Sequence, residues 1–152
     1  MTAFAERVFH MIHKIFFASK EILTHKNRLD FIEIFYLLFS LKMIELSDCD
    51  SLSFTCKDAI DTGAVHSCEQ YIFLKMMNDS SAWDSQEKEL LYWMLYAPAL
   101  MNRWRAVDLR AFNRMKEALS VIGAESEAHR NEVIAACAAL FEVPFFKSLK
   151  IS

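Results

Sequence analysis

Apolar residues recur every three or four positions along most of this chain, which is the spacing of one face of an α-helix. Between residues 3 and 24 they form a single stripe made of Phe4, Val8, Met11, Ile12, Ile15, Phe16 and Ile22. A second helix is predicted over 28–46, after the polar turn 24–27. Its apolar residues occupy nearly every side, so we expect this helix to lie in the core.

The middle of the chain contains a short strand candidate, and further predicted helices follow it. A short β-leaning run at 51–55 is the best strand candidate, and a helix is predicted directly after it over 64–77. Asp84 is placed to cap the next helix, and Glu87 three residues later completes a capping box. Pro98 has no backbone N–H, so this helix is predicted to end at about residue 97.

Two final helices are predicted on either side of Gly123, over 106–122 and 126–141. Only two Gly and two Pro occur in the chain, which is too few for the turns of an all-β domain. We therefore predict a mainly α fold: a single-domain bundle of about six helices across residues 1–152, with at most a minor β element at 51–55. Whether the chain is complete or part of a longer protein stays open.

Charge and hydropathy exclude several classes of function. The formal net charge of −3 argues against a general nucleic-acid binder, which needs a positive surface. No transmembrane segment is expected, because the most apolar stretch, 34–41, is bracketed by Glu33 and Lys42. The N-terminal region carries Glu6 and lacks a basic start and a small-residue cleavage site, so we expect no signal peptide and a cytoplasmic location where the chain is made. Secretion by another route stays open.

The potential metal-binding and disulfide-forming residues are sparse. Four Cys without a C-x-x-C pair do not make a disulfide framework, so reduced thiols are expected. His10 and His13 stand one helical turn apart near Glu6, but a zinc site needs three or four convergent ligands. The sequence therefore indicates neither a metal nor a cofactor.

Residues 54–68, FTCKDAIDTGAVHSC, contain fragments of two unrelated catalytic motifs. Residues 61–64 spell the D-T-G-A of an aspartic protease. That chemistry needs two such aspartates on loops of a Gly-rich β fold. The helical pattern of this chain does not offer that scaffold, so we set the protease aside.

The second fragment runs from Cys56 to Asp61, between the strand candidate and a predicted helix. It resembles the C-x-D-x-x-D-R loop of Sac-domain and myotubularin-type phosphoinositide phosphatases and the C-K-x-x-x-D-R loop of bacterial effector inositol-lipid phosphatases. The resemblance implies that Cys56 is the nucleophile, Asp61 the loop carboxylate and Lys57 a ligand for inositol phosphates. Backbone N–H groups as far as Gly63 would hold the phosphate oxygens.

Thr62 stands where those families have their arginine. Losing one such transition-state stabiliser costs about a hundredfold to a thousandfold in rate. Arg103 and Arg105 lie in the one basic concentration of the chain. They either supply a guanidinium to an anionic ligand from another segment or form a solvated helix face. A chance match, a non-catalytic relic and an active enzyme all stay open.

Eight Met and thirteen Phe suggest apolar surface beyond the needs of one core. Phe35 and Phe39 on helix 28–46 either face a partner or belong to the core, while Trp93 and Trp104 flank the break at Pro98. We predict a non-catalytic helical protein-interaction or ligand-binding domain with a degenerate phosphatase-like loop. We expect it to bind a protein partner or a second copy, and a phosphoinositide or other anionic ligand stays open. The alternative is a cysteine-dependent phosphoinositide or phosphoprotein phosphatase module using Cys56.

Overall fold

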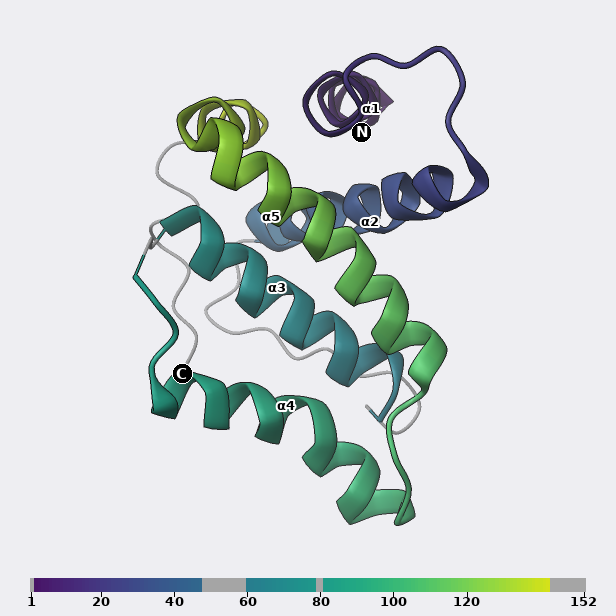
Figure 1. Ribbon diagram of the computed structural model, residues 1–152, viewed down its shortest axis with the longest axis vertical. Helices are drawn as coiled ribbons and strands as arrows, with labels where there is room; N and C mark the ends of the chain where they lie inside the picture. Colours follow the sequence, from purple (N-terminus) through teal and green to yellow (C-terminus); the bar gives the residue numbers. More distant parts are fainter. Residues whose placement is uncertain (1, 48–59, 79–80, 143–152) are drawn as a thin grey trace.

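Five helices make up the part of the chain that the computed structural model describes, which is residues 2–47, 60–78 and 81–142 (Figure 1). The helices are α1 (Thr2–Phe17), α2 (His25–Ser47), α3 (Thr62–Asn78), α4 (Ser85–Arg103) and α5 (Leu109–Ala138). They share one hydrophobic core, so the predicted all-helical single domain is confirmed. The strand predicted at 51–55 lies outside the described residues.

The long helix α5 organises the domain, because it packs against α1, α2 and α3. Helix α3 lies between α5 and α4, so α4 forms one edge of the molecule (Figure 1). The largest fully buried hydrophobic side chains come from four of the helices: Val8, Ile12, Ile34, Leu37, Leu38, Leu41, Phe73, Ile122 and Val133. No helix among the described residues combines the length and the hydropathy needed to cross a membrane.

Helix α1 is shorter than its apolar stripe predicts. It ends at Phe17 because Ala18 and Ser19 take left-handed backbone conformations, with φ of 49° and 54°. The Ser19 N–H then donates to the carbonyl of His13 at 2.9 Å. Ile22, which the pattern assigned to the helix, is exposed in the connection to α2. The predicted end at residue 24 is therefore wrong by almost two turns.

Helix α4 begins as predicted but continues through its proline. The Glu87 N–H donates to Asp84 Oδ1 at 2.8 Å and the Asp84 N–H donates to Glu87 Oε2 at 3.0 Å, which confirms the capping box. Pro98 lies inside the helix, which ends only at Arg103. Leu95 and Ala99, on either side of Pro98, are both buried, so their packing holds this part of the chain helical.

Gly123 does not end a helix. The break between the two helices predicted over 106–122 and 126–141 falls instead at His129, where a kink with non-helical angles (φ −138°, ψ 45°) divides α5 into two helical segments. Gly123 has no positive φ, so the left-handed conformation expected of a stop residue is not used. Ile122 and Ser126 are buried on this side of α5, and tertiary packing therefore outweighs the low helix propensity of glycine.

We expect Gly123→Ala to raise the free energy of unfolding by about 0.5–1 kcal/mol, because alanine loses less backbone entropy in a helix. The added Cβ would meet Met76 Cε at 3.6 Å, an ordinary contact. Urea denaturation followed by circular dichroism measures the change. Ala124→Gly, at an exposed position of the same helical segment, is the matched control and should lower the stability by a similar amount. A loss of stability in Gly123→Ala would contradict the available space.

Candidate functional site

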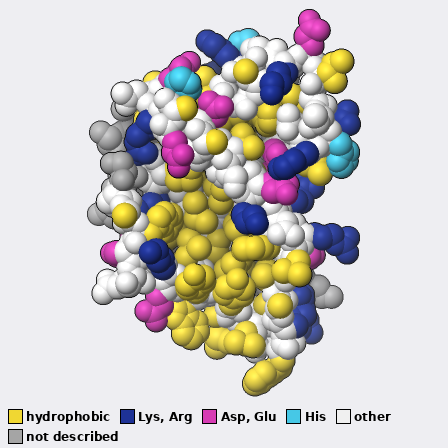
Figure 2. Space-filling view, in the orientation of Figure 1, with side chains coloured by type: hydrophobic (Ala, Val, Ile, Leu, Met, Phe, Trp, Pro, Cys, Tyr) yellow, Lys and Arg dark blue, Asp and Glu magenta, His cyan; other side chains and the backbone are white. Residues whose placement is uncertain are grey.

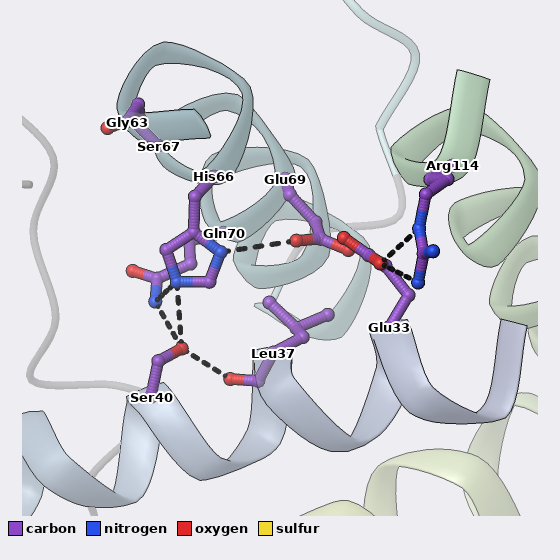
Figure 3. Close-up of polar contacts among 9 residues, drawn as sticks. All are labelled: Glu33, Leu37, Ser40, Gly63, His66, Ser67, Glu69, Gln70 and Arg114. Atoms are coloured by element: carbon purple, nitrogen blue, oxygen red, sulfur yellow. Dashed lines mark hydrogen bonds and ion pairs between the residues drawn. The ribbon is translucent and has the colours of Figure 1, made fainter. Parts of the chain in front are cut away.

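A buried polar network joins α2 to α3 (Figure 3). His66 Nε2 lies 3.0 Å from Ser40 Oγ, and His66 Nδ1 lies 3.3 Å from Glu69 Oε2. Gln70 Nε2 donates to Ser40 Oγ at 2.7 Å. The three α3 residues are at positions i, i+3 and i+4, so they project from one face of the helix toward α2.

The single hydroxyl proton of Ser40 decides how this network is connected. It points either to the carbonyl of Leu37, at 2.8 Å, or to His66 Nε2. The second choice gives the order Ser, His, acid found in hydrolase triads. Gly63, in the first turn of α3, lies apart from Ser40 in Figure 3. With either proton position, the hydrogen bonds of Ser40 with His66 and Gln70 connect α2 to α3.

Glu69 is the most deeply buried acid of the network, with 1% of its surface exposed. Burial raises the pKa of its carboxyl above the ordinary value, the hydrogen bond from His66 lowers it, and the charge of Glu33 raises it further. Glu69 Oε1 has no hydrogen-bond partner among the described residues. Oε2 of the Glu69 carboxyl group therefore has a hydrogen bond with His66, and Oε1 has none among the described residues.

Glu33 is on α2, and Figure 3 shows its carboxylate beside that of Glu69. Arg114 of α5 donates from Nε to Glu33 Oε2 at 3.0 Å, and its Nη2 forms an ion pair with the same oxygen at 2.9 Å. The cation of Arg114 thus neutralises Glu33 and leaves Glu69 as the carboxyl group with an unpaired oxygen.

A cavity of about 390 Å³ opens beside these acids. Its lining consists of Glu33, Tyr36, Phe39, Ser40, Thr62, Gly63, Val65, His66, Glu69 and Ala111. Carboxylates and an imidazole stand on one part of the wall and aromatic rings on another. Within the described ranges, no group of three or more His, Cys, Asp or Glu side chains is placed to hold a metal ion.

Neither the fold nor this cavity leads to a characterised relative. Comparison with protein-family models, with curated proteins and with solved structures found no match. No substrate or partner is therefore suggested by a related protein, and the geometry of the chain itself has to support any proposal.

The phosphatase-like loop is described only in its second half. Cys56 and Lys57 lie outside the described residues, so their roles stay predictions. Asp61 accepts a hydrogen bond from Arg105 Nη1 at 3.0 Å, a second from Arg105 Nη2, and one from the Asp108 N–H at 3.0 Å. The hydrogen bonds from Arg105, followed by that from Asp108, lower the pKa of this carboxyl. Asp61 therefore ties the start of α3 to the connection between α4 and α5.

Of the remaining residues assigned to phosphate binding, Arg105 contacts the loop, through Asp61. Gly63 is buried in the first turn of α3, where its carbonyl accepts from Ser67 Oγ at 2.9 Å. Arg105 reaches the loop from 44 positions away, but its guanidinium is held by the Asp61 carboxylate. Arg103 is exposed in the last turn of α4. The thiols of the described cysteines are not nucleophiles, because burial raises the pKa of both Cys68 and Cys137 to about 12.

The predicted interaction residues separate into two groups. Phe35 stacks on Phe9, with ring centroids 4.6 Å apart, and on Phe39 at 5.7 Å, so both predicted phenylalanines are half-buried in an aromatic cluster between α1 and α2. Trp93 and Trp104 are 61% and 87% exposed. The exposed apolar surface is therefore concentrated on α4 and its C-terminal end.

Sequence reasoning missed the network of Ser40, His66 and Glu69. No role was assigned to His66 from the sequence, and Cys68, two positions later, is buried with its Sγ 3.7 Å from the carbonyl oxygen of Leu91. The available signal was the i, i+3, i+4 spacing of His66, Glu69 and Gln70 in the predicted helix.

Proposed function

We propose that this chain is a non-catalytic helical interaction domain that binds a second copy of itself through the outer face of α4. The observation that carries the proposal is the row of exposed side chains Trp93, Tyr96, Leu100 and Trp104, which we name the α4 stripe. Spacings of three and four residues place Trp93, Tyr96 and Leu100 on one side of the helix, and Trp104 is the left-handed residue that caps its C-terminal end. Tyr92 adds a ring stacked on Tyr96, with centroids 6.3 Å apart.

The α4 stripe supports an interface because α4 carries apolar side chains on its exposed surface as well as on its buried side. Leu95 and Ala99 are buried toward the domain, while the stripe faces outward. Figure 2 shows hydrophobic side chains gathered over the α3 and α4 half of the molecule. Large contiguous apolar patches on monomers usually mark interaction sites, and Trp and Tyr dominate the binding energy of many interfaces.

The ends of the α4 stripe make a second copy the best-fitting partner. Glu89 and Arg103 are both exposed, and each stands seven positions, or two helical turns, from Tyr96. When two α4 helices pack antiparallel about Tyr96, Glu89 of each copy lies opposite Arg103 of the other. A two-fold symmetric interface requires this kind of self-complementary surface.

A charge-swap cycle measured by analytical ultracentrifugation tests the proposal. The wild-type protein is expected to dimerise with increasing concentration. Glu89→Arg and Arg103→Glu should each weaken the dimer severalfold, since exposed ion pairs contribute about 0.2–1 kcal/mol and symmetry repeats each pair. The double variant should restore the dimer. Tyr96→Asp should weaken it by roughly 30-fold or more, the effect of losing a central aromatic anchor.

Glu132→Arg, an exposed acid on α5, is the matched control and should leave the dimer unchanged. A wild-type chain that stays monomeric at all concentrations would contradict the proposal. So would a dimer that survives Tyr96→Asp with its helical content intact. If neither single swap weakens the dimer or the double variant fails to restore it, the occupant of the α4 stripe is not an antiparallel second copy.

The cysteine-dependent phosphatase module remains the alternative proposal, with Cys56 as its nucleophile. It rests on the resemblance of the loop alone. Among the described residues, the guanidinium that contacts the loop, Arg105, already pairs with Asp61. The interaction domain is therefore the better-supported of the two functions.

A further inference from the structure

The carboxylates of Glu33 and Glu69 lie side by side, and Arg114 of α5 pairs with Glu33. Glu69 Oε1 is buried and has no hydrogen-bond partner within the described ranges. An unsatisfied buried carboxylate oxygen is costly, and the neighbouring Glu33 adds repulsion. A positively charged hydrogen-bond donor would remove both penalties.

The cavity next to Glu69 has room for such a donor with a hydrocarbon body. Its volume of about 390 Å³ is at the lower end of small-molecule sites. Tyr36 and Phe39 supply aromatic walls, and Val65 and Ala111 supply aliphatic ones. Aromatic faces attract cations, so these walls favour the same charge as the two acids.

The hydrogen bonds around Glu69 hold the acid in a fixed orientation. His66 Nδ1 contacts Glu69 Oε2, and the imidazole is itself held by Ser40 Oγ at 3.0 Å. Oε2 is therefore occupied, and Oε1 is the oxygen left for a ligand. Such positioning by surrounding hydrogen bonds is what a preorganised binding site requires.

We propose that this cavity binds a small organic cation, an alkylammonium, arylammonium or guanidinium group, that donates hydrogen bonds to Glu69 Oε1 and to Glu33. The hydrocarbon part of the ligand packs on Tyr36 and Phe39. A metal ion fits less well, because Glu33, His66 and Glu69 are not arranged among the described residues as a group that could hold one. The site is separate from the α4 stripe and goes beyond the interaction function.

One competing arrangement needs no ligand. A protonated Glu69 would donate its Oε1 proton to the Glu33 carboxylate, and a single proton would then satisfy both acids. This arrangement gives the cavity no preference for a cation over a neutral molecule of the same shape. The two possibilities therefore differ in a measurable way.

The experiment compares benzylamine, which is cationic at pH 7, with benzyl alcohol, which has the same ring and no charge. Each is titrated into the wild-type protein at pH 7 and followed by ¹H–¹⁵N NMR. We expect benzylamine to bind at least about tenfold more tightly, with shifts centred on residues 66–70, because hydrogen bonds to a charged group are the stronger kind. Agmatine tests the guanidinium form.

Glu69→Gln should weaken benzylamine binding by about tenfold or more and leave benzyl alcohol unaffected. Glu127→Gln, an exposed acid of α5, is the matched control and should change neither. Equal binding of the amine and the alcohol to the wild-type protein, or no binding of either, overturns the proposal even if Glu69→Gln fails to fold. Benzylamine binding that persists in Tyr96→Asp would separate this site from the α4 stripe.

Discussion

Phe73→Ala is expected to lower the free energy of unfolding by about 3–5 kcal/mol, because truncating a buried phenylalanine removes its contacts and leaves a cavity. Phe73 is 1% exposed and is the largest of the fully buried side chains among the described residues. It lies in α3, the helix that contacts α2, α4 and α5. Few neighbouring segments can move to fill the space without disturbing another contact.

Urea denaturation followed by circular dichroism measures this loss. Domains of this size are stable by about 5–15 kcal/mol, so the variant should show a much lower midpoint or be partly unfolded without denaturant. Phe9→Ala is the matched control: it removes the same side chain from α1, where Phe9 is 45% exposed, and should cost less than half as much. Equal losses in the two variants would contradict the central position of Phe73.

The helical fold could be predicted because its signals are local. Apolar spacing and the capping box at Asp84 act within a few residues of each other, so the sequence alone reveals them. The predicted stops at Pro98 and Gly123 failed for the opposite reason. Both lie beside buried residues, Ala99 and Ile122, whose packing against distant helices outweighs a local preference.

The polar network could not be predicted in the same way. Ser40 meets His66 across 26 positions, and Glu33 meets Arg114 across 81. These contacts depend on how the helices pack against one another, which periodicity does not specify. The pairing of Asp61 with Arg105 shows the same limit, since the sequence marked both residues but not the ion pair between them.

Glu69→Gln is expected to raise the free energy of unfolding at pH 7 by about 1–3 kcal/mol, the cost of an unsatisfied buried polar group. Burial, followed by the charge of Glu33, raises the pKa of the Glu69 carboxyl above its ordinary value of 4.5. The folded protein therefore binds this proton more tightly than the unfolded chain. The wild-type protein should lose stability as the pH rises from about that ordinary value through the raised pKa of the folded state.

Glutamine keeps the shape of the side chain and cannot ionise, so Glu69→Gln should lack this loss over the same pH window. Urea denaturation at several pH values compares it with the wild-type protein and with Glu127→Gln, whose exposed side chain should leave the pH dependence unchanged. A variant less stable than wild type at pH 7 would mean that the Glu69 carboxylate has a counter-ion in the folded protein. A variant that is more stable and no longer binds benzylamine would instead show that a ligand-binding acid is retained at the expense of stability, as binding sites often require.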